Sequence, residues 1–137
     1  MTAIKEQDII TKTSSKNFEE SYNTLVDIIT NNPNLKIVAQ LDHQANASSV
    51  GLQLNPTRLI LFGNPQLGTP LMQKTQLIGL DLPQKILIWE DDHGEVKVSY
   101  NNPEFLKSRH NISNQEDIFT TINNALGAIS NKVIAGN

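Results

Sequence analysis

The chain contains no cysteine, which excludes disulfide bonds, thiolate metal ligands and thiol nucleophiles. It also lacks a basic cluster, because its 11 lysines and arginines are scattered and are outnumbered by 14 acidic residues. Proteins that bind nucleic acids present basic patches to the phosphates, so this charge balance argues against such a partner. No apolar run is long enough to cross a bilayer, and residues 1–20 carry no apolar signal-peptide core. We therefore expect a cytoplasmic protein with no membrane partner.

The apolar residues that are present fall into periodic segments, and no linker divides them. The sequence thus predicts a single domain over residues 1–137. A first helix is indicated by one apolar stripe, which consists of Phe18, Tyr22, Leu25 and Ile29. Asn17 supplies its N-cap and the following NNPN segment ends it. A long C-terminal helix is predicted over about 114–133, opened by a Ser113-x-x-Glu116 capping box.

Between these helices the pattern is that of strands. A short first strand is expected at 9–10, and LKIVAQLDH (35–43) alternates as a half-buried strand does. RLILF (58–62) and KILIW (85–89) are unbroken apolar runs, typical of strands that are central in a sheet or covered on both faces. After KILIW the chain is expected to turn at Gly94 and to return as the second strand of a hairpin. The predicted fold class is α+β, a two-layer, mostly antiparallel sheet of about five strands with two main helices on one face.

The segment FGNPQLGTPLMQ (62–73) interrupts this pattern with two glycines and two prolines. It resembles the start of a phosphate-binding loop, but no lysine follows Gly68, and Pro65 and Pro70 each remove a backbone donor. We therefore expect a rigid turn in which the glycines take unusual dihedral angles. In this interpretation Thr69 caps a short helix that begins at Pro70, and its N–H groups and hydroxyl are available to a carboxylate or another small anion.

Candidates for catalysis are few. No Gly-x-Ser-x-Gly elbow is present, and the neighbours Asp42 and His43 would point to opposite faces of a strand. His110 follows Arg109 at the end of a short segment, where both cations would favour a helix C-terminus. A metal site would need both histidines to meet an acid such as Glu90, and no ligand spacing supports one. We predict neither a metal nor a cofactor.

Several short motifs occur in a characteristic order: Asp42-His43, FGNPQLGTPLMQ, GLDLPQKILIWED (79–91), VSYNNP (98–103) and Arg109-His110. Over about residues 15–112 the chain therefore resembles the domain of unknown function family 302, small proteins of bacteria and archaea without an assigned activity. The resemblance implies a β-α-β(4)-α arrangement like that of the TATA-binding protein. It also implies a homodimer. A shared fold lends no DNA binding, since function belongs to sites.

The polar residues that these motifs retain stand at strand ends and in loops, where recognition usually resides. We expect a domain that binds or senses a small anionic metabolite near the 63–72 loop. Its predicted ligand-binding residues are Asn64, Gly68, Thr69, Met72, Trp89 and Arg109. One alternative is a small hydrolase or isomerase whose acid–base residues come from His43, His110, Asp42 and Glu90. Another is a dimerising domain that binds a protein partner and no small ligand.

Overall fold

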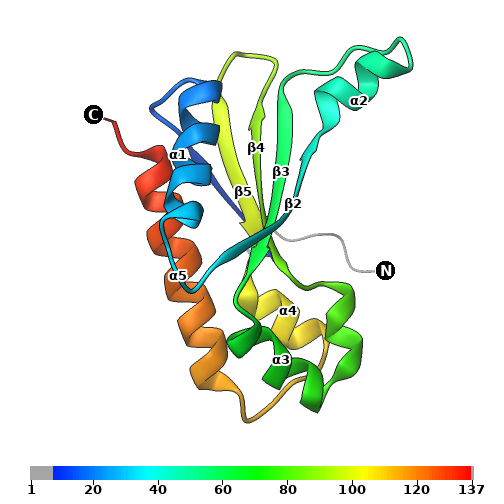
Figure 1. Cartoon of the computed structure of the whole chain (residues 1–137), viewed down its shortest axis with the longest axis vertical. Helices are drawn as coiled ribbons and strands as arrows, with labels where there is room; N and C mark the ends of the chain where they lie inside the picture. The colour runs from blue at the N-terminus through cyan, green and yellow to red at the C-terminus, as the bar shows by residue number, and fades with distance from the viewer. Residues whose placement is uncertain (1–7, 137) are drawn as a thin grey trace.

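The computed structural model of the protein describes residues 8–136. Its centre is a five-stranded antiparallel sheet with the strand order β1-β5-β4-β3-β2. The strands are β1 (Ile9–Thr13), β2 (Lys36–Asp42), β3 (Thr57–Gly63), β4 (Gln84–Glu90) and β5 (Val96–Asn101). Helices α1 (Phe18–Thr30) and α5 (Glu116–Ile134) lie together on one face of this sheet (Figure 1). The predicted α+β class is confirmed.

The core forms between that face and the two long helices. Alternate residues of the central strands point toward the helices, and Ile60, Ile86 and Ile88 have no exposed surface. From α1, Leu25 and Ile29 meet them, also fully buried. The apolar stripe of α5 completes this layer with Phe119, Ile122, Leu126, Ile129 and Val133. Burial on this face explains why the two helices and the sheet fold as one unit.

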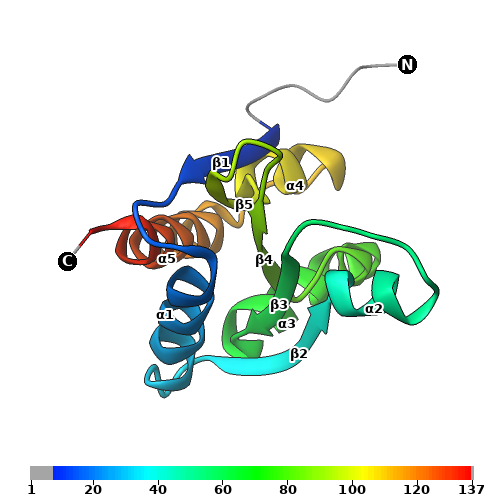
Figure 2. The ribbon, with the colours of Figure 1, turned by 90° about the horizontal axis from the view of Figure 1, so that it is seen from above.

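The sheet has a second face that the long helices do not cover. It carries Leu59, Leu61, Leu87 and Trp89, which remain partly exposed. In Figure 2 α1 and α5 both lie on the other side of the strands. The unbroken apolar runs of β3 and β4 therefore belong to central strands with one face covered by the long helices. We call the second surface the uncovered face.

The long helices begin differently. Asn17 caps α1 as predicted, since its side-chain oxygen accepts a hydrogen bond from the Glu20 N–H at 2.8 Å. The capping box predicted for α5 is wrong. The helix starts at Glu116 behind Gln115, which makes no side-chain cap. Between Ser113 and the helix the chain turns through Asn114, whose φ of 65° is left-handed, so Ser113 stands outside the helix end.

Four short helical segments connect the main elements. Helix α2 (His43–Ser49) follows β2, and α3 (Pro65–Lys74) with the 3₁₀ helix η2 (Gln76–Leu80) joins β3 to β4. Helix α4 (Pro103–Arg109) follows β5. Figure 1 shows α2 projecting at one end of the sheet and α3 and α4 gathered at the opposite end. The two ends therefore offer separate surfaces.

In the 63–72 segment the helix begins at Pro65, five residues before the predicted start at Pro70. Asn64 caps α3 by accepting the Gln66 N–H at 3.0 Å, and Pro65 fixes the first helical φ. Pro70 lies inside α3, so the prediction of a Thr69-capped helix from Pro70 is wrong. The glycines take no unusual dihedrals there. Gly63 instead allows close approach, because a Cβ on it would lie 3.3 Å from the Pro83 side chain. The hairpin glycine, Gly94, has the expected positive φ of 80°.

Strand β2 is an outer strand and it is irregular. Its pairing with β3 shifts between Ile37 and Ala39, which leaves Val38 as an extra residue. The Val38 side chain is 63% exposed. The bulge lies close to the start of β2, next to the end of the sheet that holds α3.

Candidate functional site

A cavity of about 360 Å³ lies at the α3 end of the sheet, between β2, α3 and α5. We call it the α3–α5 cavity. Its walls are mainly apolar and come from segments far apart in the sequence. Helix α5 contributes Ile122, Ala125, Leu126 and Ile129, and the opposite side comes from Phe62, Leu67, Met72, Leu82 and Pro83. Pockets of this size and lining are typical of small-molecule sites.

A few polar groups interrupt these walls. Lys36, Asn64, Thr69 and Gln84 line the cavity, and no acidic residue of the part that the structure describes does. The side-chain oxygen of Asn64 caps α3, while its side-chain NH₂ makes no hydrogen bond to the described part of the chain. The Lys36 side chain makes no hydrogen bond or ion pair within residues 8–136. The polar lining therefore consists of one cation and groups that can donate hydrogen bonds.

The structure brings four of the six predicted ligand-binding residues to this cavity: Asn64, Gly68, Thr69 and Met72. Trp89 and Arg109 are not among its lining residues. Trp89 lies on the uncovered face and donates its indole N–H to the Ser99 hydroxyl at 2.9 Å. It cannot serve as an apolar wall of this cavity, because the sheet stands between the two.

Arg109 is committed to an ion pair. Its Nη1 donates to both carboxylate oxygens of Asp81, at 2.9 and 3.0 Å. His110 Nε2 lies 2.5 Å from Oδ2 of the same carboxylate. The His110 side chain is only 4% exposed and that of Asp81 only 14%. We call these three residues the Asp81 clamp, which ties the end of α4 to the loop after η2.

The Asp81 clamp was not foreseen from the sequence. Asp81 stands inside the GLDLPQ motif, 28 residues before Arg109, and no spacing rule joins two such positions. Its consequence for the site is indirect. The next two residues, Leu82 and Pro83, form part of the cavity wall, so the clamp holds that wall in place.

The four predicted acid–base residues do not converge. His43 opens α2 at one end of the sheet, whereas His110 follows α4 at the other end (Figure 1). Asp42 is the N-cap of α2 and accepts the Ala45 N–H at 2.9 Å. Glu90 ends β4 and pairs with Val96 across the hairpin. The arrangement therefore offers no paired histidines, and the burial of His110 keeps it from a substrate.

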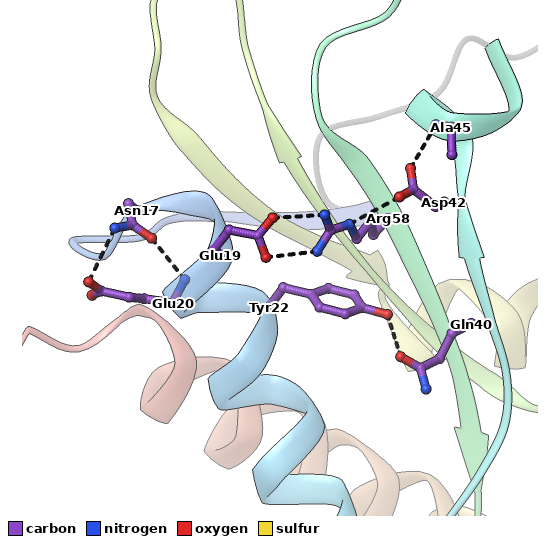
Figure 3. A network of polar contacts seen from close by, with 8 residues as sticks. All are labelled: Asn17, Glu19, Glu20, Tyr22, Gln40, Asp42, Ala45 and Arg58. Carbon is purple, nitrogen blue, oxygen red and sulfur yellow. Dashed lines mark hydrogen bonds and ion pairs between the residues drawn. The ribbon is translucent and has the colours of Figure 1, made fainter. Parts of the chain in front are cut away.

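A polar network ties α1 to β2 and β3 at the end of the sheet that carries α2 (Figure 3). Arg58 donates through both terminal nitrogens to Glu19, at 3.0 and 2.8 Å, and its Nε lies 3.4 Å from Asp42. The guanidinium also stacks 4.9 Å from the ring centres of Phe18 and Tyr22. Sequence patterns gave no hint of this network, because its members come from three separate elements.

The electrostatics of this network follow from its geometry. The hydrogen bonds between Arg58 and Glu19 lower the pKa of Glu19 and raise the pKa of Arg58. Burial raises the pKa of Tyr22, whose hydroxyl donates to Gln40 at 2.6 Å. The donors of Arg58 already have acceptors, so we assign this network a structural role.

Two kinds of feature are absent from residues 8–136. No group of three or more histidine, aspartate or glutamate side chains is arranged to hold a metal ion there. None of the helices in that range combines the length and apolarity that a bilayer crossing needs.

Comparison with known proteins identifies the family. The model of the family described as "Domain of unknown function DUF302" matches residues 10–129. The chain belongs to the DUF302 family. The match extends from the second residue of β1 through most of α5, and so it includes almost the whole sheet and every residue that lines the α3–α5 cavity.

A solved structure confirms the fold of this DUF302 protein. It is the crystal structure of an uncharacterized conserved DUF302 protein from Bacillus stearothermophilus, with a TM-score of 0.81. The similarity covers 92% of this chain and 98% of that one at 20% sequence identity. At this level of identity the two chains share the fold, and no activity follows from the likeness.

Curated relatives match a shorter part of this DUF302 chain. The fluoride-specific ion channel FluC 1 of Brucella suis biovar 1 is 46% identical over 84 residues, or 61% of this chain and 33% of the relative. FluC 2 of Brucella melitensis biotype 1 is equally similar over 31% of its length. The chain thus spans about a third of the length of these relatives. The name of these relatives refers to their whole length, of which this chain matches only a part.

Proposed function

We propose that this protein binds a small, largely apolar molecule in the α3–α5 cavity. The observation that carries the proposal is the cavity itself, about 360 Å³ in volume and lined mainly by aliphatic side chains. Large apolar pockets with a few convergent polar groups are the usual sites of small ligands. The expected site near the 63–72 loop is kept, but Trp89 and Arg109 are no longer part of it.

Packing supports this proposal. Side chains in protein interiors ordinarily interdigitate with few voids larger than a water molecule. Here the buried residues Leu126 and Ile129 belong to the core and also line the α3–α5 cavity. An apolar ligand would restore the contacts that these side chains lack on their cavity side.

Filling the cavity should weaken binding. Ala125 lines it from α5, and in the variant Ala125→Phe an aromatic ring would occupy the ligand's space. We expect the affinity for a small apolar probe such as 1-hexanol, measured by amide chemical shifts, to fall at least about tenfold. The matched control is Ala128→Phe, because Ala128 lies on the exposed side of the same helix and does not line the cavity. Equal binding by both variants would place the ligand elsewhere and refute the proposal.

We also propose that two copies of the chain associate. The segment 43–56, which we call the arm, projects beyond the sheet (Figure 1) and carries exposed apolar side chains. Val50, Leu52 and Leu54 are 70%, 65% and 45% exposed, and α2 has no buried residue. Each copy thus has both an apolar arm and an uncovered face. A two-fold arrangement in which each arm covers the partner's uncovered face would bury both surfaces.

A charge in the arm should dissociate such a dimer. For Leu52→Asp we expect the mass measured by light scattering during size-exclusion chromatography to fall from two chains to one. The control variant Leu77→Asp alters a residue of similar exposure, 69%, that lies on η2 outside the arm. It should remain a dimer. The second proposal is wrong if the wild-type protein has the mass of one chain even at high concentration. It is also wrong if Leu52→Asp keeps the mass of two chains.

A further inference from the structure

We infer that the ligand of the α3–α5 cavity is an amphiphile with one negative charge, a free carboxylate on an unbranched apolar chain, with Lys36 as its counter-ion. This inference rests on the proposed function and adds the chemical class of the ligand. It depends on the polar groups at the cavity, on their missing partners and on the cavity's size.

The charge of the lining selects the head group. Among residues 8–136, Lys36 is the only cation that lines the cavity, and no aspartate or glutamate of that range lines it. Most other cations of the described chain are occupied, as Arg58 is by Glu19 and Arg109 by Asp81. The Lys36 ammonium instead lacks a partner within residues 8–136. An anion is the complement of such a site, whereas a cationic head group would be repelled.

The other polar residues of the lining favour a carboxylate among the anions. The side-chain amide NH₂ of Asn64 makes no hydrogen bond within residues 8–136, since only its side-chain oxygen is engaged, by the Gln66 N–H. Gln84 and Thr69, whose side chains also carry hydrogen-bond donors, line the cavity as well. These neutral donors, together with a single cation, suit a head group with one negative charge. A phosphate, with its higher charge, would leave one negative charge without a counter-ion.

The size of the cavity limits the apolar part. A volume of about 360 Å³ holds roughly a dozen water-sized groups at about 30 Å³ each. A carboxylate of eight to ten carbons has about this number of non-hydrogen atoms. Each methylene that enters the apolar walls should tighten binding about fourfold, until the cavity is full.

The test is calorimetric titration of the full chain with unbranched carboxylates of increasing length, and with 1-octanol and octylammonium as probes of equal length. We expect affinity to rise about fourfold per methylene up to octanoate or decanoate and then to level off. Octylammonium should bind more weakly than octanol. Lys36→Met should weaken octanoate binding about fivefold, as for an exposed ion pair, and leave octanol binding unchanged.

Lys74→Met is the matched control. It removes the same charge from an exposed position at the end of α3 that does not line the cavity, so octanoate binding should stay as in the wild type. If octanoate and octanol bind equally well, and Lys36→Met changes neither, then the carboxylate assignment is wrong while the apolar cavity site stands. If neither probe binds at all, both the inference and the proposed function are wrong.

Discussion

Replacing Leu126 with alanine is expected to lower the free energy of unfolding by about 3 kcal/mol. The side chain is only 1% exposed and lies between the core and the α3–α5 cavity. Its removal costs the transfer free energy of three carbons and joins a new void to a cavity that is already there. Chemical denaturation followed by circular dichroism would measure the loss.

The control for this variant is Leu77→Ala. Leu77 is 69% exposed, so its truncation should change the free energy of unfolding by less than about 0.5 kcal/mol. A loss of similar size in both variants would mean that Leu126 is not a core residue. Because Leu126→Ala enlarges the cavity, the folded variant should also prefer a longer ligand than the wild type does.

Breaking the Asp81 clamp is the second large effect. For Asp81→Ala we expect a loss of about 2 kcal/mol in the free energy of unfolding, because the part-buried hydrogen bond between His110 and this carboxylate disappears together with the two exposed ones from Arg109. His110, with a side chain 4% exposed, would keep its place without an acceptor. Half of the Arg109 side chain is exposed, so water would solvate it and limit the damage.

A double-mutant cycle distinguishes this clamp from general surface electrostatics. Asp81→Ala and His110→Ala together should cost less than the sum of the two single losses, since they remove the same interaction. The comparison variant Asp27→Ala removes an exposed carboxylate on α1 and should have little effect. Additive losses would show that Asp81 and His110 act independently, contrary to their 2.5 Å contact.

The fold was largely predictable because its determinants are local. Three elements could be predicted from local patterns alone: the apolar stripe from Phe18 to Ile29 and the apolar runs at 58–62 and 85–89. The structure confirms all three, as α1, β3 and β4. The helix starts were less predictable. Asn64 caps α3, although Thr69 is an equally plausible cap by sequence. Before α5 the chain turns through the left-handed Asn114, so the plausible cap Ser113 is not used.

The site was predictable only in part, for a related reason. The chain segment that interrupts the pattern at 63–72 does lie at the cavity, because such loops stand at strand ends. Arg109 was not predictable, since its partner Asp81 is distant in sequence. Lys36 was equally hidden. It occupies an ordinary strand position, and only the packing of α3 and α5 shows that a cavity opens beside it.

The bulge in β2 has a consequence for aggregation. A regular outer strand offers a row of unpaired backbone groups to any other extended chain, which can lead to fibres. The extra residue Val38 interrupts that row within the seven residues of β2. A further strand could therefore not continue the sheet in register along its whole length. The irregularity thus works against uncontrolled growth of the sheet at its β2 edge.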